Sequence, residues 1–397
     1  MKTWLLKLLD LSSEQEQIVK TPPQESSLVL GLPGSGKTQV LVQRAAYLIQ
    51  SHGISSKNIR LFVFTDVLEK FIRSEIKSLG FPGEMVITFD NWCHSFYVNH
   101  ISQDLPRVYI NGRIDYRKIR FGVLDALQKN EALQKDLGFA LVDDGQDLTP
   151  EVFEILSLAA QHITVLADPH HKLYHEGASE SFVLDTLKLS KGISFLQRDY
   201  RNSPAVAQLA SHFIEDENFR NTYLSQIRTV QSSSEGPLCY VASSEEKELV
   251  HLSQIVQQRQ VMKDKVGIFL PTNSLVHRVA KALKDRGIET EKAITKDAEN
   301  VIHTPYDFGN SLPKVTTYHM AKGLTFDSVL IPQLTENAFA KIPSSLRCRL
   351  LFVGIARASK WVYMSTVRGQ EFREIGILKL AEKEEHLRIL HRLNPLQ

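Results

Sequence analysis

Short apolar runs alternate with longer segments of helical periodicity along most of this chain. Apolar runs of about four to eight residues bounded by turn residues predict buried strands, and apolar positions spaced about three and four apart predict amphipathic helices. In the first half the predicted strands are Ser27–Leu30, Ile59–Phe64, Met85–Thr88, Phe139–Val142 and Ile163–Ala167, and the predicted helices include Thr38–Gln50, Leu68–Ser78 and Pro150–Ala160. This alternation is typical of βαβ units, and it therefore predicts an α/β fold with a mainly parallel sheet.

The same alternation restarts near residue 193. The predicted strands of this second half are Ile193–Leu196, Leu238–Val241, Val266–Leu270, Val315–Thr317, Ser328–Pro332 and Trp361–Thr366, and its predicted helices include Ala205–Phe213, Glu245–Arg259 and Ser274–Arg286. The 397 residues are too many for one ordinary domain and enough for two. We therefore predict two similar α/β domains, residues 1–191 and 192–397, with a polar loop at 231–237 and terminal helices within 371–392.

Composition narrows the class of protein. An apolar share of 43% and a charged share of 23% indicate a soluble globular protein, and a net charge of only +2 excludes a bulk attraction to nucleic acid. The three cysteines, Cys93, Cys239 and Cys348, lie far apart, form no zinc-binding spacing and suggest a reducing compartment. Residues 1–10 resemble a short amphipathic helix more than a signal peptide, and no run is apolar enough to span a membrane. We expect a cytoplasmic protein without a membrane partner.

A glycine-rich segment, residues 31–38, follows the first predicted strand and precedes a predicted helix. Its sequence GLPGSGKT matches the phosphate-binding pattern G-x-x-x-x-G-K-[ST] in the context that the pattern requires. The backbone of such a loop wraps a phosphate with its N–H groups, here those of Gly31, Gly34, Ser35 and Gly36. Lys37 supplies charge to the β- and γ-phosphates and Thr38 a hydroxyl to Mg²⁺, so we predict ATP and Mg²⁺ as ligands.

Two adjacent carboxylates, Asp143 and Asp144, follow the predicted strand Phe139–Val142. Taken alone, such a pair is most often a solvated turn. Downstream of a phosphate-binding loop, however, the end of a parallel strand is where ligands bind. We therefore interpret Asp143 as a ligand of Mg²⁺ and Asp144 as the base that orients the attacking water.

These segments are part of a longer collinear series, from residue 11 to residue 358, that resembles the motifs of the UvrD/Rep-type superfamily 1 DNA helicases. The members of the series beside the phosphate-binding loop are Leu11–Val19, Phe64–Asp66, Ile87–Asp90, Asp143–Asp147, Leu166–Tyr174, Asp199–Arg201, Thr317–Leu324 and Arg349–Ala358. The resemblance implies two RecA-like P-loop NTPase domains. Each motif is modest alone, and their order makes the resemblance specific.

The resemblance assigns nucleotide contacts to five further residues. Gln15 reads the adenine, which suits a carboxamide because it donates and accepts at once. Tyr200 stacks on the adenine, and Arg201 and Arg357 reach the γ-phosphate from the second domain. His171 stands where the family usually has a glutamine that senses that phosphate. For the two arginines the simpler alternative is an ordinary surface residue.

The resemblance also implies contacts with single-stranded DNA, with RNA as the alternative strand. The residues at matching positions are Phe64, Thr65, Thr88, Phe89, Tyr174 and His319. Phe89 also belongs to an aromatic group with helical spacing, together with Trp92, Phe96 and Tyr97, for which packing in the core is the default interpretation. Asp66 departs from the family, because an acidic side chain stands where a neutral asparagine usually meets the strand.

Several departures bear on function. Asp144 replaces the usual glutamate, Thr325 replaces a motif V glutamate, and the segment after Tyr174 lacks the expected aromatic and arginine. The chain is also too short between 99 and 137, and between 286 and 314, to hold the family's large accessory subdomains. Four histidines, namely His162, His170, His171 and His175, cluster in sequence, but their spacing matches no standard metal site.

The function that the resemblance implies is an ATP-dependent translocase or helicase acting on single strands with 3′–5′ polarity. The first alternative is a nucleotide-switched sensor or regulatory subunit, partnered by a nuclease in a repair or anti-phage complex. A P-loop kinase or signalling NTPase is the second, and it leaves the motifs around Arg201, His319 and Arg357 unexplained.

Overall fold

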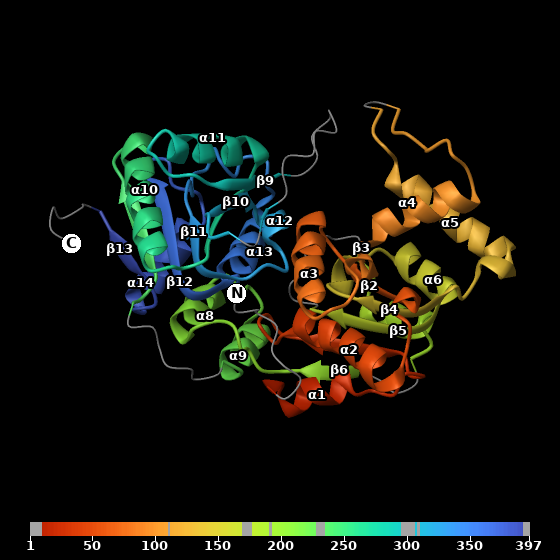
Figure 1. Ribbon diagram of the computed structural model, residues 1–397. Coiled ribbons are helices and arrows are strands. Elements are labelled where there is room, and N and C mark those ends of the chain that lie inside the picture. The colour runs from red at the N-terminus through yellow and green to blue at the C-terminus, as the bar shows by residue number, and fades with distance from the viewer. Residues whose placement is uncertain are drawn as a thin grey trace. The chain divides into compact units, whose positions relative to one another are not determined.

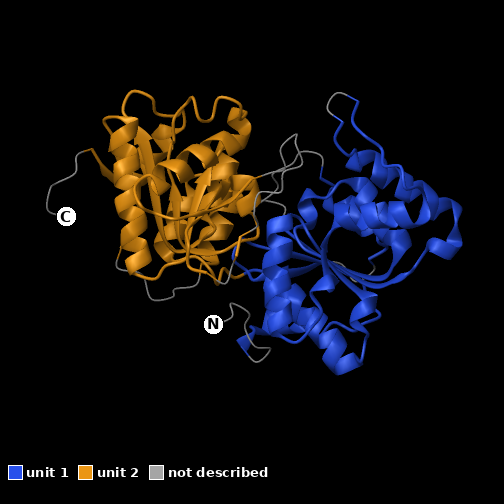
Figure 2. Cartoon of the chain, turned by 45° about the horizontal axis from the view of Figure 1, so that its top comes forward, with its two compact units in different colours: residues 1–197 blue, residues 198–397 orange. Residues whose placement is uncertain are grey.

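The computed structural model describes residues 10–109, 112–168, 177–189, 193–227, 235–294, 306–307 and 310–391. The chain divides into two compact units, Met1–Gln197 and Arg198–Gln397, coloured separately in Figure 2. The first unit therefore ends at residue 197 rather than at residue 191. The reason is that the strand Ile193–Leu196, which the sequence pattern placed in the second half, pairs with the first strand of unit 1.

Unit 1 is built on a parallel sheet of six strands in the order β3-β2-β4-β5-β1-β6 (Figure 1). Its strands are β1 (Ser27–Gly31), β2 (Ile59–Val63), β3 (Val86–Thr88), β4 (Leu137–Val142), β5 (Ala160–Ala167) and β6 (Ile193–Leu196). Its helices are α1 (Ser13–Val19), α2 (Lys37–His52), α3 (Asp66–Ser78), α4 (Phe89–His100), α5 (Tyr116–Lys129), α6 (Pro150–Ala159) and α7 (Glu180–Thr186).

The helices of unit 1 bury both faces of its sheet. Helix α2 packs against β2, β4 and β5, while α4, α5, α6 and α7 pack on one another in sequence order. The core of this second layer includes Phe62, Cys93, Val123 and Phe153. Strand β4 is buried at every position, as expected for a central parallel strand covered on both sides.

An antiparallel bridge between Arg107 and Ile114 closes the segment between α4 and α5. The backbone N–H of Val108 donates to the carbonyl of Arg113 at 2.7 Å, so the segment begins as a narrow hairpin. Figure 1 shows it standing away from the body of unit 1, between α4 and α5. Tyr109, near its end, is fully exposed.

Unit 2 contains a second parallel sheet, of seven strands in the order β13-β7-β12-β11-β8-β10-β9. Its strands are β7 (Leu238–Ala242), β8 (Val266–Leu270), β9 (Glu291–Ala293), β10 (Lys314–Thr317), β11 (Phe326–Ile331), β12 (Ala358–Val367) and β13 (Arg388–Leu390). Its helices are α8 (Pro204–Ser211), α9 (Glu217–Ser225), α10 (Glu245–Val261), α11 (Asn273–Lys284), α12 (Tyr318–Ala321), α13 (Ser344–Ile355) and α14 (Ile375–Lys383).

Two helix layers cover the sheet of unit 2. Helices α10 and α11 pack against β7, β8 and β10 and share a core that includes Leu252, Ile268, Val279 and Trp361. Helices α8, α12 and α13 pack on β12, β8 and β11 and on one another. The two sheets confirm the predicted α/β class with two RecA-like domains.

Some element predictions need correction. The tail 371–392 was predicted to be helical, yet Arg388–Leu390 forms strand β13 and pairs in parallel with β7. This strand has only three residues and lies at the sheet edge, so the charged tail contains no apolar run long enough to indicate it. The predicted packing of the aromatic group is confirmed, because Phe89 is buried in the core and Trp92, Phe96 and Tyr97 pack against it.

The predicted N-terminal helix at residues 1–10 lies outside the described residues, apart from its last residue, as do residues 231–234 of the predicted loop. Among the described helices, none combines the length and the apolar character that a membrane crossing requires. The three cysteines are buried: Cys93 in unit 1, Cys239 and Cys348 in unit 2.

Candidate functional site

Residues of the predicted nucleotide site gather along one edge of the unit 1 sheet. The register aligns Leu30 of β1 with Ala167 of β5, and Val142 of β4 with Val165 of β5. The glycine-rich loop directly follows β1, and an aspartate directly follows each of β4 and β5. In open parallel sheets this carboxyl edge is where ligands bind.

The glycine-rich loop has the backbone that phosphate binding requires. Gly34 (φ 76°) and Gly36 (φ 82°) adopt left-handed conformations that a β-carbon disfavours. Ser35 is fully buried, and its hydroxyl has no hydrogen-bond partner among the described residues. The loop runs directly into the first turn of α2, where backbone N–H groups have no partner within the helix and attract anions. These residues fit a bound phosphate chain.

The ammonium group of Lys37 lies across the loop that it terminates. Its Nζ donates to the carbonyl oxygens of Gly31 at 2.8 Å and Leu32 at 2.9 Å. A third contact, at 3.3 Å, joins it to the carboxylate of Asp168, which is completely buried. The positive charge thus lies at the centre of the loop, where it is held by oxygen atoms at the carboxyl ends of β1 and β5.

Thr38 and Asp143 form the pair expected of a magnesium site. The Thr38 hydroxyl donates to Oδ2 of Asp143 at 2.6 Å. Burial, reinforced by the charge of Asp144, raises the pKa of Asp143 to about 6, while the Thr38 hydrogen bond and Lys37 act in the opposite direction. A buried carboxylate with a raised pKa gains from a cation, and hydroxyl and carboxylate oxygens are ligands that Mg²⁺ prefers.

Asp144 holds an unusual backbone conformation, with φ 53° and ψ 39°. Its Oδ1 accepts a hydrogen bond from Nε2 of Gln146 at 3.0 Å, and Oε1 of Gln146 accepts one from the backbone N–H of Asp168 at 2.9 Å. One carboxamide therefore links the acids that follow β4 and β5, and fixes the direction of the Asp144 side chain.

Gln15 is tied to the phosphate-binding loop. Its Nε2 donates to the carbonyl of Ser35 at 3.0 Å, and its Oε1 accepts from the backbone N–H of Ser12 at 3.0 Å as part of a capping box. A β-carbon on Gly36 would lie 2.6 Å from the same Nε2. Gln15 thus lies against the loop, and its hydrogen bond to Ser35 positions the loop backbone.

Buried Arg44 of α2 holds the helix that carries Gln15. Its Nη1 donates to the carbonyls of Val19 at 3.2 Å and Thr21 at 2.9 Å, just after α1, while its Nε donates to the hydroxyl of Thr164 at 3.0 Å. Burial lowers the pKa of Arg44 to about 10. The guanidinium thus joins α1, α2 and β5 behind the site.

Thr65 and Thr88, from two motifs that resemble strand contacts, are helix caps at neighbouring strand ends. The hydroxyl of Thr65 accepts from the N–H of Leu68 at the start of α3, and that of Thr88 accepts from the N–H of Asn91 at the start of α4. Strands β2 and β3 are adjacent, with Val63 aligned to Thr88. Two helix N-termini therefore open side by side at the same sheet edge, beside the strands that carry the nucleotide residues.

Acidic side chains lie between these two caps. Asp66, the first residue of α3, accepts from Nδ2 of Asn91 at 3.3 Å. Glu69 accepts from the backbone N–H of Thr88 at 2.8 Å and pairs with Arg73 at 2.9 Å. Each acid stabilises a helix N-terminus, because its negative charge interacts favourably with the positive end of the helix dipole. Asp66 also adds negative charge where a phosphate would approach.

Phe89 does not contribute to a strand-binding surface. Its side chain is 5% exposed and packs on Phe62 and Trp92, with ring centroids 5.4 Å and 5.7 Å apart. The assignment of Phe89 to nucleic-acid contact is therefore corrected, because the core already occupies its ring. Phe64 is half-buried at the end of β2.

In unit 2, Arg201 and Arg357 come together at the edge where β12 begins. Nη1 of Arg201 donates to the carbonyl of Ala356 at 3.2 Å, the residue directly before Arg357. Arg357 is 4% exposed, and its Nε donates to the carbonyl of Val353 in α13 at 3.2 Å. The hydrogen bond to Ala356 thus holds Arg201 beside the backbone that carries Arg357, although the two arginines lie far apart in sequence.

A turn at Asp199 sets the position of the motif that contains Tyr200 and Arg201. Oδ1 of Asp199 accepts from the backbone N–H groups of Arg201 at 2.8 Å and Asn202 at 3.1 Å. The side chain of Asn202 reaches the carbonyls on both sides of Arg357, at 3.2 Å and 2.5 Å. Tyr200 is half-buried beside this turn.

His319 lies on the opposite edge of the unit 2 sheet. It belongs to α12, which directly follows β10, and the Thr317 hydroxyl caps this short helix. Burial lowers the pKa of His319, which favours the uncharged form of its ring. Within unit 2 the predicted strand contact and the two arginines therefore occupy opposite ends of the strands.

Two predicted site residues, His171 and Tyr174, fall in 169–176, outside the described residues, as do His170 and His175. Thr325 and its neighbours connect α12 to β11.

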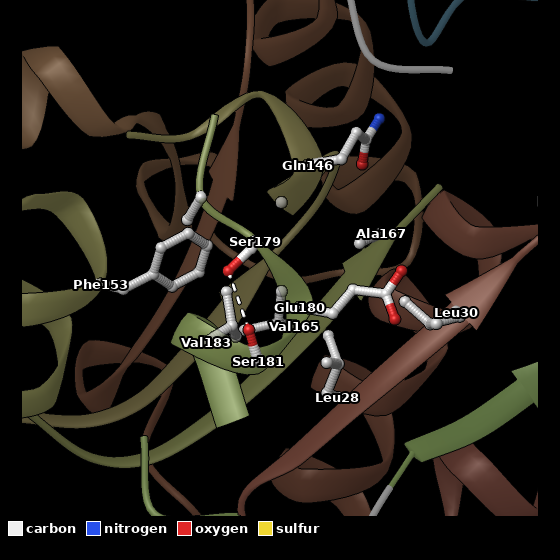
Figure 3. A pocket seen from close by; sticks show the side chains of 12 residues that line it. Leu28, Leu30, Gln146, Phe153, Val165, Ala167, Ser179, Glu180, Ser181 and Val183 are labelled. Atoms are coloured by element: carbon white, nitrogen blue, oxygen red, sulfur yellow. Dashed lines mark hydrogen bonds between the residues drawn. The ribbon is translucent and has the colours of Figure 1, made fainter. Parts of the chain in front are cut away.

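A cavity of about 380 Å³ lies next to the nucleotide residues in unit 1 (Figure 3). Apolar side chains from β1, β5 and α6 line it, and the segment Ser179–Ser181 borders it. Gln146 is shared with the acid cluster, but the lining found among the described residues includes none of 31–38. This cavity is therefore distinct from the phosphate site.

The sequence patterns did not single out Gln146, Asp168 or Arg44. Gln146 and Asp168 fall inside motif segments, and their partners become visible only when strand ends meet. The signal for Arg44 was a lone arginine in the apolar run of α2, a position where an unpaired charge would be costly.

Comparisons with known proteins match both units. The profile of the UvrD/REP helicase N-terminal domain matches residues 11–109, and that of the UvrD-like helicase C-terminal domain matches residues 314–365. A probable DNA helicase of Mycoplasma pneumoniae is 22% identical over 487 residues, covering 94% of this chain and 87% of that protein.

Two further relatives show more partial matches. A probable DNA helicase II homolog of Mycoplasma capricolum is 21% identical over 73% of this chain, and the match spans only 54% of that protein. The ATP-dependent DNA helicase PcrA of Bacillus subtilis is 33% identical over 26% of this chain and 14% of its own length. The matched domains come in the same order as the motifs and the two parallel sheets, and this chain belongs to the UvrD/REP helicase family.

Proposed function

We propose that this chain binds ATP with Mg²⁺, hydrolyses it, and uses the cycle to move along single-stranded DNA with 3′–5′ polarity. The observation that carries the proposal is the meeting of Lys37, the Thr38–Asp143 pair and Asp144 at the carboxyl ends of β1 and β4. A P-loop, a magnesium-type oxygen pair and a second carboxylate are the parts that phosphoryl transfer to water requires.

Each residue of unit 1 has a specific task in this proposal. Thr38 and Asp143 would hold Mg²⁺, which when bound neutralises phosphate charge. Lys37 exchanges the loop carbonyls that it now contacts for phosphate oxygens. Asp144 accepts a proton from the attacking water, with its direction set by Gln146.

The arginines of unit 2 are proposed to supply charge to the γ-phosphate. This part rests on the motif order and on the fact that unit 2 by itself brings Arg201 next to Arg357. Guanidinium groups suit the task because they stay charged and present several donors in a fixed plane. Tyr200 is proposed to stack on the adenine, and Gln15 to contact it in addition to positioning the loop.

The strand is proposed to run past the two helix N-termini at Thr65 and Thr88. Each capping hydroxyl accepts one hydrogen bond and can still donate its proton to a phosphate oxygen. Backbone contacts of this type track a strand without reading its sequence. Phe64 and, in unit 2, His319 are the further proposed contacts. DNA is the proposed strand because the similar proteins are named as DNA helicases.

The test measures steady-state ATPase activity of the full chain with no strand, with single-stranded DNA and with single-stranded RNA. Lys37→Ala is expected to lower turnover at least about 100-fold without unfolding the protein, since it removes the positive charge that faces the transferred phosphate. Lys57→Ala is the matched control, because Lys57 is exposed on unit 1 away from the loop. Turnover in folded Lys37→Ala close to that of the control would contradict the assigned site.

A second candidate function is a nucleotide-switched sensor or regulatory subunit of a repair or anti-phage nuclease complex. The observation that favours it is Asp66, which places negative charge between the two helix N-termini. The two functions differ in the response to DNA. A motor shows ATPase stimulation by single strands and arrival at the strand end, whereas a sensor shows binding without directional movement.

A strand-separation assay on a duplex with a 3′ single-stranded tail examines unwinding. Opening a duplex costs about 1.4 kcal/mol per base-pair step. The segment between α4 and β4, with its short hairpin and helix α5, is much smaller than an accessory subdomain that could trap separated bases. We propose translocation with poor unwinding of long duplexes by the chain alone. Efficient unaided unwinding would contradict this part and leave the ATPase site intact.

A further inference from the structure

A cluster of potential metal ligands lies in unit 2, in a region that the proposed function does not use. His212 directly follows α8, Glu384 directly follows α14, and His386 lies two residues before β13. One ligand atom from each lies within 4.8 Å of the other two. The side chain of His212 is only 7% exposed, that of His386 is 28% exposed and that of Glu384 is 50% exposed. The cluster is thus half-enclosed and open to solvent on the glutamate side.

The backbone holds these three residues firmly. Helix α14 ends at Lys383, and Glu385, two residues later, adopts the left-handed conformation at φ 62°. The N–H of His386 then donates back to the carbonyl of Ala381 at 2.8 Å, which is the hydrogen-bond pattern of a Schellman motif. Since β13 follows at once and pairs with β7, Glu384 and His386 sit between two fixed elements.

The distances suit a transition-metal ion. Nε2 of His212 lies 2.9 Å from Nδ1 of His386, and these two nitrogens lie 3.6 Å and 3.7 Å from the same oxygen, Oε2 of Glu384. A point equidistant from the three atoms is about 2.0 Å from each of them, which equals the usual zinc–nitrogen and zinc–oxygen distances. No backbone movement is needed to reach these lengths.

The charge balance points the same way. Two ring nitrogens that face each other at 2.9 Å share at most one proton between them, so at least one lone pair is held against the other ring. Two imidazole nitrogens and a carboxylate are together a ligand set for Zn²⁺ rather than for Mg²⁺ or Ca²⁺.

We propose that His212, Glu384 and His386 form a binding site for a transition-metal dication, with Zn²⁺ as its occupant and water in the fourth position. The ion joins the end of α8 to the turn between α14 and β13. Because β13 is a three-residue strand at the edge of the sheet, such a link fixes the last described strand to the body of unit 2. The site is independent of the ATPase activity.

The test uses the full chain, freed of metal by a chelator and then titrated with Zn²⁺ and, separately, with Co²⁺. We expect one tightly bound ion per chain, the visible absorption of four-coordinate cobalt, and a rise in the unfolding midpoint of about 5 °C at hundredfold excess over Kd. His386→Ala and Glu384→Gln should each weaken binding at least about tenfold, while His391→Ala, an exposed histidine outside the cluster, should not.

Two outcomes overturn the proposal. The first is titration of wild-type protein without saturable binding. The second is binding that persists unchanged in both cluster variants, since it would place the ion elsewhere, for example at the oxygen ligands of Thr38 and Asp143. Glu384→Gln keeps the test decisive if His386→Ala fails to fold, because Glu384 is half exposed and its replacement leaves the backbone bonds in place.

Discussion

At the scale of single residues, Asp144 combines a chemical role with a conformational one. Its left-handed backbone turns the chain sharply after β4, and aspartate and asparagine are the non-glycine residues that adopt this conformation most readily. The bend brings the carboxylate to the amide of Gln146. A glutamate, as the family usually has here, would lengthen the side chain in a turn that favours the shorter acid.

Replacements of Asp144 separate these two roles. Asp144→Asn keeps the turn and should leave thermal stability near that of wild type, while turnover falls about 100-fold or more because an amide does not accept the proton of water. Asp144→Glu should also lower turnover, at a cost of about 1 kcal/mol in stability for the left-handed turn. The measurements are ATPase rate and unfolding midpoint. A faster Asp144→Glu enzyme would show that the shorter acid, and not the turn, limits catalysis.

The residues that could be predicted from sequence were those whose chemistry is local. The loop 31–38 carries its whole pattern within eight positions, so its form followed from the sequence alone. Gln146, Asp168 and Arg44 act through partners on other strands, and those partners are set by strand order and register. For Phe89 the competing principle was packing, since an aromatic ring next to Phe62 stabilises the core instead of stacking on bases.

At the scale of elements, the pair of helix starts at α3 and α4 defines the proposed path of the strand. Helices of 13 and 12 residues begin at adjacent strand ends, each with a threonine cap. The partial positive charge of each N-terminus attracts phosphate, and Asp66 and Glu69 offset part of that attraction. The balance between dipole and carboxylate therefore sets the affinity for DNA at this edge.

Removal of the Asp66 charge should strengthen that affinity. Asp66→Asn retains a polar group that can contact Asn91 and removes one negative charge where a phosphate would approach, so we expect tighter binding of single-stranded DNA, by about three- to tenfold at low salt. Fluorescence anisotropy at several salt concentrations provides the measurement. Glu84→Gln, an exposed acid of unit 1 away from both caps, is the control. Equal affinities for the two variants would remove this edge from the strand path.

Element predictions succeeded where the burial pattern was strong. The inner strands β4 and β8 are buried at every position and give unbroken apolar runs, so the sequence indicated them clearly. Strands β9 and β13 were missed because each has three residues and lies at the outer edge, where charged side chains face solvent. Helix α4 was indicated only by the helical spacing of its aromatic residues, and helix α5 was not predicted, although its buried residues Ile119, Val123, Leu124 and Leu127 follow helical spacing.

At the scale of the whole molecule, each unit has a sheet, two helix layers and a core of its own, and the division falls at Gln197/Arg198. A chain with two separate cores is expected to unfold in two steps when one core is less stable than the other. Ligand binding to unit 1 alone would then shift one step, in proportion to the logarithm of ligand concentration.

Because unit 1 holds one buried cysteine and unit 2 holds two, the number of reactive thiols reports which unit has unfolded. Burial raises the pKa of Cys93 well above its ordinary value, that of Cys239 to about 12 and that of Cys348 to about 11, so all three should react slowly with alkylating reagents in the native chain. In rising denaturant, opening of unit 1 should add one label per chain, and opening of unit 2 should add two. Intact-mass spectrometry reads these numbers directly, and ATP with Mg²⁺ should delay the single label selectively. Simultaneous labelling of all three thiols at every denaturant concentration would mean that the two cores unfold as one.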